Sequence, residues 1–194
     1  MSDFSIVTTS LETANIQSFC LRQKAVDVPS DTTPQLLRHV VESMLACLYA
    51  AGGVGLAAPQ VGIGWRLFLA MERGTEDPPL VLINPRFTDL SDNMVDGREG
   101  CLSLPGYVSL KVPRFSTVKV DGLNQFLMPI QLEAHDFLAR VIQHEYDHLD
   151  GILYIDRLRD REDLALYSPK VRAQKAADKI FSGSIINNET DVNM

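Results

Sequence analysis

The stretch His-Glu-Tyr-Asp-His from His144 to His148 constrains this chain more than any other feature of its sequence. On an α-helix, residues i and i+4 lie one turn apart on the same face, so His144 and His148 can both reach one cation. Glu145 would then stand beside that cation as a proton carrier. The pattern predicts a helix that carries a metal site suited to hydrolysis. A solvated pair of histidines on a surface helix is the alternative.

A third metal ligand has to come from elsewhere, because the sequence after the helix does not supply one. A zinc endopeptidase of the metzincin kind would place a third histidine where this chain has Tyr154. A thermolysin-like enzyme would use a glutamate further downstream on a second helix. The nearest candidate, Glu162, lies in a run of charges that we expect to be a solvated loop.

Cys101 is the upstream candidate for the third ligand, within Glu-Gly-Cys-Leu-Ser at positions 99–103. Its thiolate would complete a set of two histidines and one cysteine, with the fourth tetrahedral position left for water. Cys20 and Cys47 lack such neighbours, and we expect both to be small buried hydrophobic residues. Three protein ligands with one open position predict a catalytic metal site.

Three segments together resemble the peptide deformylase family. They are Gly-Val-Gly-Leu-Ala-Ala-Pro-Gln at 53–60, the cysteine segment at 99–103 and Gln-His-Glu-Tyr-Asp-His-Leu at 143–149. The family has them in this order and at comparable spacings. The flanking Ile-Asn-Pro at 83–85 and Val-Pro-Arg at 112–114 also fit.

The resemblance implies an enzyme that removes the formyl group from the N-terminal formyl-methionine of newly made proteins and releases formate. Its metal ligands would be the cysteine and the two histidines named above. Glu145 would be the acid/base, and the Gln60 side-chain amide and the Leu102 backbone N–H would be the oxyanion donors. Fe²⁺ is the implied natural ion, although Zn²⁺, Ni²⁺ or Co²⁺ suit the same ligands.

The methionine side chain of such a substrate needs an apolar slot. Val54 and Val141 are expected walls by the resemblance, and Leu138 by its nearness to the motifs. Gly55 is grouped with them as a substrate-binding position, because glycine permits a close backbone approach.

The sequence departs from the family in the segment that follows the cysteine motif. The seven residues 106–112 between Pro105 and Pro113 are one more than the commonest spacing, and Val108 stands where an arginine is often found. The loop along the substrate groove is therefore expected to differ. Asp136 also replaces a frequent glycine, which a helix N-cap would tolerate.

The composition predicts one globular domain, residues 1–194, with a flexible tail from about 183. A net charge of −7 argues against a general nucleic-acid binder. An odd number of distant cysteines indicates a reducing compartment. The N-terminus resembles neither a secretory signal nor an Arg-rich transit peptide, and no apolar run is long enough for a membrane span. We therefore expect a cytoplasmic protein.

Periodicity predicts an α+β fold, in which mixed or antiparallel sheets pack around a central metal-binding helix. An N-terminal helix should start at Thr33-Pro34 and stop at Gly52-Gly53. The histidine helix should run from an N-cap at Asp136 to near Gly151. Strands are expected over residues 66–71, 80–83, 86–90, 115–120 and 126–134, on either side of a Cys101 loop.

A C-terminal helix is expected over residues 168–181, with a face of four basic residues. This face is either solvated or a contact with ribosomal RNA, near which formyl-methionyl nascent peptides would emerge.

Two other classes of function stay open beside a deformylase. One is a divergent zinc peptidase, and the other is a noncatalytic, metal-stabilised binding module that would need four protein ligands.

Overall fold

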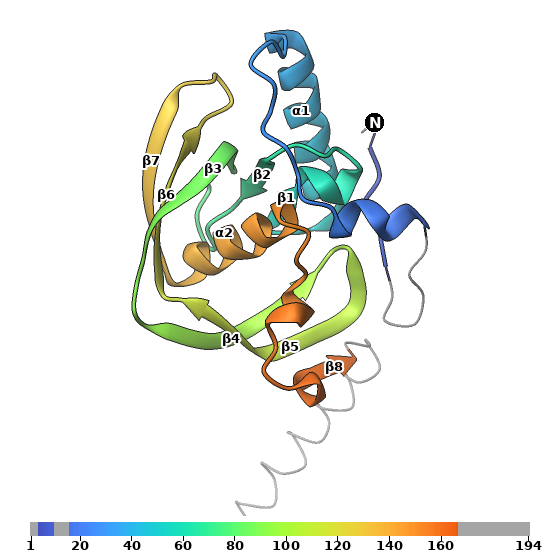
Figure 1. Ribbon diagram of the computed structural model, residues 1–194, viewed down its shortest axis with the longest axis vertical. Coiled ribbons are helices and arrows are strands. Elements are labelled where there is room, and N and C mark those ends of the chain that lie inside the picture. Colours follow the sequence, from blue (N-terminus) through green and yellow to red (C-terminus); the bar gives the residue numbers. More distant parts are fainter. Residues whose placement is uncertain (1–3, 10–15, 167–194) are drawn as a thin grey trace, which may run out of the picture.

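The computed structural model describes residues 4–9 and 16–166. Within these ranges the chain forms two α-helices, four short 3-10 helices (η) and eight strands that make two antiparallel sheets (Figure 1). In chain order the elements are η1 Ile16–Arg22, α1 Pro34–Ala51, β1 Gly55–Ala57, η2 Ala58–Val61, β2 Leu67–Ala70, β3 Leu80–Leu90, β4 Met94–Cys101, β5 Leu104–Phe115, β6 Thr117–Leu123, β7 Pro129–His135, α2 Asp136–Leu149, η3 Tyr154–Arg157, η4 Arg161–Asp163 and β8 Leu164–Leu166.

The larger sheet has the order β1-β2-β3-β6-β7, and its strand β2 is covered on both faces. Successive side chains of a strand point to opposite faces, so β2 sends Leu67 and Leu69 toward α1 and Phe68 and Ala70 toward α2. All four of these side chains are buried. A strand buried on both faces is a continuous apolar run, which explains why β2 lacks the usual polar alternation.

Helix α1 begins and ends as its sequence predicts. The Thr33 side chain accepts a hydrogen bond from the Leu36 N–H, and Pro34 takes the first helical position, where no N–H is needed. Gly52 ends the helix in the left-handed conformation (φ +63°). The helix therefore delivers the chain directly to the Gly53–Gln60 segment.

Helix α2 lies between the two sheets, at the centre of Figure 1. Its apolar side, including Ala139, Ile142 and Leu149, packs on the larger sheet. Its other side bears Arg140 and His144, which hydrogen-bond to Glu99 of β4. The predicted arrangement of sheets around a metal-binding helix is thus confirmed, and the strand pairs of both sheets are antiparallel.

The smaller sheet, β4-β5-β8, was not predicted as strands. Cys101 was expected in a loop, but it is the last residue of β4, joined to β5 by a two-residue turn. Glycines in β4 and prolines in β5 disguise these strands in the sequence, since both residue types are unfavourable in sheets. Register shifts on either side of Glu99 and Gly100 show how the sheet accommodates them.

The predicted strands 80–83 and 86–90 are one strand, β3, with an irregularity between Ile83 and Arg86. Asn84 lies there at φ +50° and its side chain accepts a hydrogen bond from the Val28 N–H. The strands expected over 115–120 and 126–134 are β6 and β7, shifted toward the C-terminus. Asn124 explains the shift of β7, because its side chain accepts hydrogen bonds from the Phe126 and Met128 N–H groups and extends the turn.

Asp136 is not the N-cap that the sequence suggested. The residue is the first of α2 and adopts φ +46°, and the cap position is His135, whose side chain makes no capping bond. The Asp136 N–H donates to the Ser116 carbonyl, which ties the start of α2 to the connection between β5 and β6. Asp136 therefore occupies a left-handed position that favours glycine.

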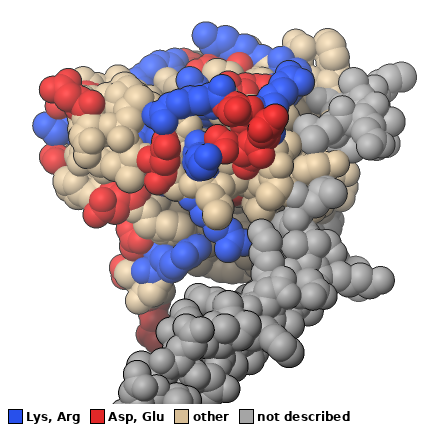
Figure 2. All heavy atoms as spheres, turned by 90° about the horizontal axis from the view of Figure 1, so that it is seen from below, with Lys and Arg blue, Asp and Glu red and all other residues tan. Residues whose placement is uncertain are grey.

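None of the described helices combines the length and apolar character needed to cross a membrane. Figure 2 shows acidic and basic side chains side by side on the face seen from below. Two ion pairs join β5 and β4 to the segment before β8, those of Lys111 with Asp163 and of Arg159 with Asp96. The C-terminal helix expected over residues 168–181 lies outside the described residues.

Asp136→Gly should raise the free energy of unfolding by about 1 kcal/mol, because glycine adopts positive φ without the steric cost of a Cβ atom. Asp136→Ala should lower it. Urea unfolding of the three proteins checks the order Gly above Asp above Ala. Ordinary helix propensity gives the reverse order for Ala and Gly, so an Ala variant more stable than the Gly variant would contradict the left-handed assignment.

Candidate active site

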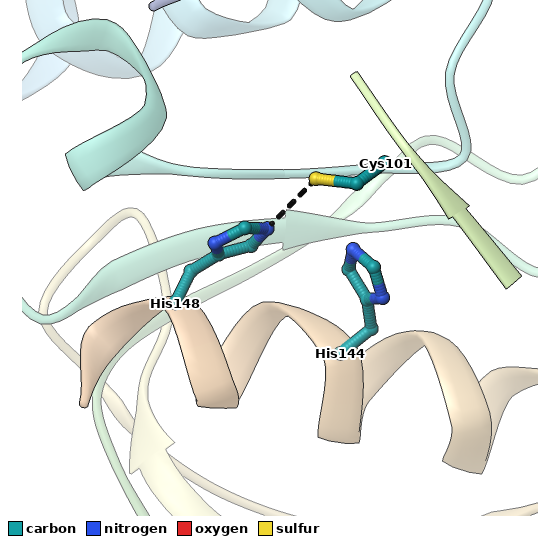
Figure 3. A group of neighbouring side chains, drawn as sticks. All are labelled: Cys101, His144 and His148. Atoms are coloured by element: carbon teal, nitrogen blue, oxygen red, sulfur yellow. Dashed lines mark hydrogen bonds between the residues drawn. The ribbon is translucent and has the colours of Figure 1, made fainter. Parts of the chain in front are cut away.

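Three potential metal ligands converge between α2 and β4 (Figure 3). His144 and His148 project from consecutive turns of α2 toward Cys101 at the end of β4. The Cys101 Sγ lies 3.3 Å from the His148 Nε2, and the ligand atoms of all three residues lie within 4.8 Å of one another. The structure therefore brings together the three residues predicted as ligands.

The geometry fits a divalent cation. Ligand atoms about 2.1 and 2.3 Å from a tetrahedral metal ion lie about 3.6 Å apart, close to the Cys101–His148 separation. The His144 Nδ1 is engaged by a Glu99 oxygen at 2.7 Å, which leaves the Nε2 lone pair of His144 for a metal. Among the described residues, no further His, Cys, Asp or Glu joins the cluster. Three protein ligands of these types are the kind of set that catalytic zinc sites use.

Glu99 is a buried carboxylate that holds His144 in orientation. Besides His144, it accepts hydrogen bonds from Arg114 at 2.8 and 3.0 Å and from Arg140 at 3.0 Å. Burial by itself would raise the pKa of Glu99, but the bonds from His144 and Arg114 outweigh it and hold the pKa well below its usual value. The carboxylate therefore stays ionised and can fix the imidazole.

The same network continues to the end of α2. Arg114 also donates to Asp147 at 2.6 Å, and Arg157 of η3 donates to Asp147 at 2.6 and 3.0 Å. Tyr154, which was excluded as a ligand, lies with its ring nearly parallel to that of His144, with centroids 6.0 Å apart. These residues position the ligand helix without contributing a ligand atom.

Sequence reasoning missed this network, although one signal was available. Arg140, His144 and Asp147 recur at the spacing i, i+4, i+7, which places three polar side chains on one face of a helix that is otherwise packed in the core. The spacing could not show that Glu99 of β4 and Arg114 of β5 bond to that face of the helix.

Glu145 is buried against Gly55 of β1. A Cβ atom at position 55 would lie 2.3 Å from the Glu145 Oε1, so only glycine leaves room for this carboxylate. The Oε2 atom is buried and has no hydrogen-bond partner within residues 4–9 and 16–166. Burial raises the pKa of Glu145 to about 7, so the carboxyl group can both accept and release a proton near neutral pH.

Gln60 and Leu102 lie on two segments that meet beside Cys101. The Gln60 Nε2 is 3.6 Å from the Cys101 Sγ and donates to the Ser103 hydroxyl at 3.2 Å. The Gln60 Oε1 accepts from the Ala57 N–H at 2.8 Å, which fixes the amide with its NH₂ toward the cysteine. Leu102 follows Cys101 in the β4–β5 turn and lines the same cavity.

A cavity of about 710 Å³ opens onto these groups. Val54, Gly55 and Val141 all line it, whereas Leu138 packs against the core of α2 and the larger sheet. Gly106, Tyr107 and Val108 form another part of the wall, so the segment that departs from the family does border the cavity. This volume suits a short peptide end rather than a folded protein surface.

Comparison with known proteins places the site in a family. The model of the family described as polypeptide deformylase matches residues 11–163. A peptide deformylase from Prochlorococcus marinus subsp. pastoris is 42% identical over 160 residues, which cover 81% of this chain and 78% of the relative.

Solved structures agree with the sequence match. The crystal structure of a peptide deformylase from Synechococcus elongatus in complex with actinonin has a TM-score of 0.72 and 37% identity. The match covers 84% of this chain and 82% of the Synechococcus chain. The Met-Ala-Ser-bound structure of a class I type b peptide deformylase from Acinetobacter baumannii has a TM-score of 0.71 and 30% identity. The match covers 81% of this chain and 100% of the Acinetobacter chain.

Arg114→Met should lower the free energy of unfolding by about 3–5 kcal/mol, because it leaves the buried Glu99 and Asp147 carboxylates without their shared cation. Arg86→Met is the matched control. Arg86 also pairs with a carboxylate, that of Asp27, but the two side chains are 52% and 53% exposed, so its loss should cost no more than about 1 kcal/mol. Urea unfolding measures both variants. Equal losses of unfolding free energy would show that the buried network stabilises the fold no more than an exposed ion pair does.

Proposed function

Because this chain belongs to the peptide deformylase family and removes the N-formyl group from nascent peptides, we propose that the reaction runs at the Cys101, His144 and His148 site with Glu145 as proton carrier. One observation carries this proposal. The Glu145 Oε2 is buried without a hydrogen-bond partner among the described residues, and Glu145 lines the same cavity as the ligands Cys101 and His144. A metal site that served only to stabilise the fold would have no use for such a carboxyl group.

A divalent cation held by the two histidines and the cysteine would supply a water molecule of lowered pKa. Glu145 accepts a proton from the attacking water at its Oε2 atom. It then delivers that proton to the amine nitrogen of the methionine as the C–N bond to the formyl group breaks. The products are formate and a peptide with a free N-terminus.

Negative charge develops on the formyl oxygen during the attack, and Gln60 and Leu102 are the proposed donors to it. The Gln60 amide is oriented before substrate arrives by its bond with the Ala57 N–H. A prearranged donor of this kind contributes roughly 3 to 4 kcal/mol to lowering the barrier. The Leu102 backbone N–H would be the second donor from the opposite segment.

Val54, Gly55 and Val141 are proposed to bind the methionine end of the substrate. Val54 and Val141 are apolar walls of the cavity, and Gly55 lets Glu145 and the substrate share a narrow space. The Acinetobacter baumannii neighbour is named for a bound Met-Ala-Ser tripeptide, which is the size and chemistry expected of a deformylation product. Peptide preference beyond methionine would be set by the Gly106–Val108 wall.

Fe²⁺ is the proposed natural ion on the strength of the family resemblance, because two imidazoles and a thiolate by themselves suit Fe²⁺, Zn²⁺, Co²⁺ and Ni²⁺ alike. We further propose that residues 1–194 act as a single catalytic domain in the cytoplasm. Contact with the ribosome through residues 168–181 stays a prediction, and deleting the chain from Pro169 tests it by ribosome co-sedimentation.

Glu145→Gln should lower the rate of formate release from formyl-Met-Ala-Ser by about a hundredfold or more while metal stays bound, because the amide cannot carry the proton. Glu133→Gln, which changes an exposed carboxylate of β7, should leave the rate unchanged. Wild-type turnover in the Glu145 variant would remove it from the mechanism. Cleavage of an unblocked longer peptide by the wild-type protein would instead favour a zinc peptidase.

Gly55→Ala should reduce turnover at least tenfold, because its Cβ would displace the Glu145 carboxylate that carries the proton. Gly64→Ala is the control, since a Cβ at position 64 meets no atom within 4 Å. Formate release and metal content are measured for both. Loss of metal from the Gly55 variant would mean that the glycine serves the ligand helix rather than the proton carrier.

Protein purified without oxygen should contain stoichiometric iron and should release formate faster than the zinc-loaded form. Cys101→Ser should lower the metal content, because a hydroxyl is a poor substitute for a soft thiolate. Metal analysis paired with the formate assay checks both statements. Equal rates for the two metals would refute the iron assignment, and unchanged metal content in the serine variant would remove Cys101 from the site.

A further inference from the structure

Residues 4–9 precede the part of the chain that matches the family model, yet they contact the active site. The Val7 N–H donates to the Gln60 carbonyl at 2.7 Å, and the Thr9 N–H donates to the Ser103 carbonyl at 2.8 Å. One short segment outside the helices and strands thus bonds to the 3-10 helix that carries Gln60 and to the turn that carries Leu102.

The spacing of these two bonds matters. N–H groups two residues apart can lie no more than about 7 Å apart, because each residue spans at most about 3.6 Å. The carbonyls of Gln60 and Ser103 are therefore held at a fixed separation by one short piece of backbone. Gln60 and Ser103 are themselves 1% and 0% exposed, so few other groups can reach these carbonyls.

The other end of the segment is anchored on α1. The Cys47 Sγ donates to the Phe4 carbonyl at 3.2 Å, and the Phe4 ring meets that of His39 edge-on with centroids 6.2 Å apart. Phe4 and Ile6 also pack against the core between α1 and the larger sheet. The segment is thus fixed to the scaffold as well as to the site.

We propose that residues 4–9 are a positioning strap that sets the distance between the two oxyanion donors. The proposal rests on the proposed donor roles of Gln60 and Leu102. Among the described residues, no backbone hydrogen bond joins η2 directly to the β4–β5 turn, and the direct link between them is the Gln60–Ser103 side-chain bond at 3.2 Å. Without the strap, the two donors would converge less closely on one oxygen.

Val7→Pro removes the N–H that bonds to Gln60 and keeps an apolar residue at the position. Since a displacement of about 1 Å is costly to a catalytic group, kcat should fall about tenfold, with KM for formyl-Met-Ala-Ser and metal content unchanged. Thr8→Pro is the matched control, because it introduces the same ring between the two bonding positions and leaves both N–H groups in place. It should retain wild-type kcat.

A double-mutant cycle separates positioning from general stability. In a Gln60→Ala background, Val7→Pro should lower kcat by less than about twofold, because the donor it positions is gone. Thr9→Pro removes the N–H that bonds to Ser103, next to Leu102, so it should still lower kcat in the Gln60→Ala background. An equal loss from Val7→Pro in both backgrounds, or a loss from Thr8→Pro as large as that from Val7→Pro, would overturn the strap.

The experiment also distinguishes the strap from the roles on which it rests. Gln60→Ala with wild-type turnover would refute the donor role itself, whereas Val7→Pro with wild-type turnover would refute only the strap. Should Val7→Pro give no folded protein, a chain that begins at residue 10 keeps the whole family match and makes the same comparison without proline. Wild-type kcat in that shortened chain would overturn the proposal.

Discussion

The carboxylate of Glu99, buried among His144, Arg114 and Arg140, is the interaction on which the rest of this structure depends. It joins the smaller sheet to α2 and orients a metal ligand at the same time. A buried charge is tolerated only when it is paired and hydrogen-bonded, so the smaller sheet can pack on the polar side of the helix only with this network in place. Folding and ligand geometry are therefore coupled in this chain.

Close approach on the opposite side of α2 depends on shape rather than charge. Gly55 of β1 leaves room for the Glu145 carboxylate, just as Gly97 of β4 leaves room for Arg140, where a Cβ would lie 2.6 Å from the guanidinium. Small residues on both neighbouring strands thus let two long polar side chains of one helix be buried. The helix thus packs closely against β1 and β4, which holds its two histidine ligands in place beside the cavity.

The reactive groups come from three parts of the chain that the fold assembles. α2 supplies two ligands and the proposed proton carrier, β4 and its turn supply Cys101 and the proposed donor Leu102, and η2 supplies the proposed donor Gln60. The N-terminal residues then bond to two of these three segments. Preorganisation of this kind places the cost of ordering in the folding of the protein, so that little rearrangement is needed when substrate arrives.

The sequence alone determined the ligand helix, the three ligands and the helix ends at Thr33 and Gly52, because these depend on local spacing and capping. The prediction of deformylase activity came from the family resemblance. Tertiary structure decided the rest: the strands β4 and β5, which glycine and proline disguise, the left-handed Asp136, and the meeting of Glu99, Arg114 and Asp147. Such contacts join residues far apart in the chain, and a single sequence holds no periodicity that records which distant side chains will share a buried charge.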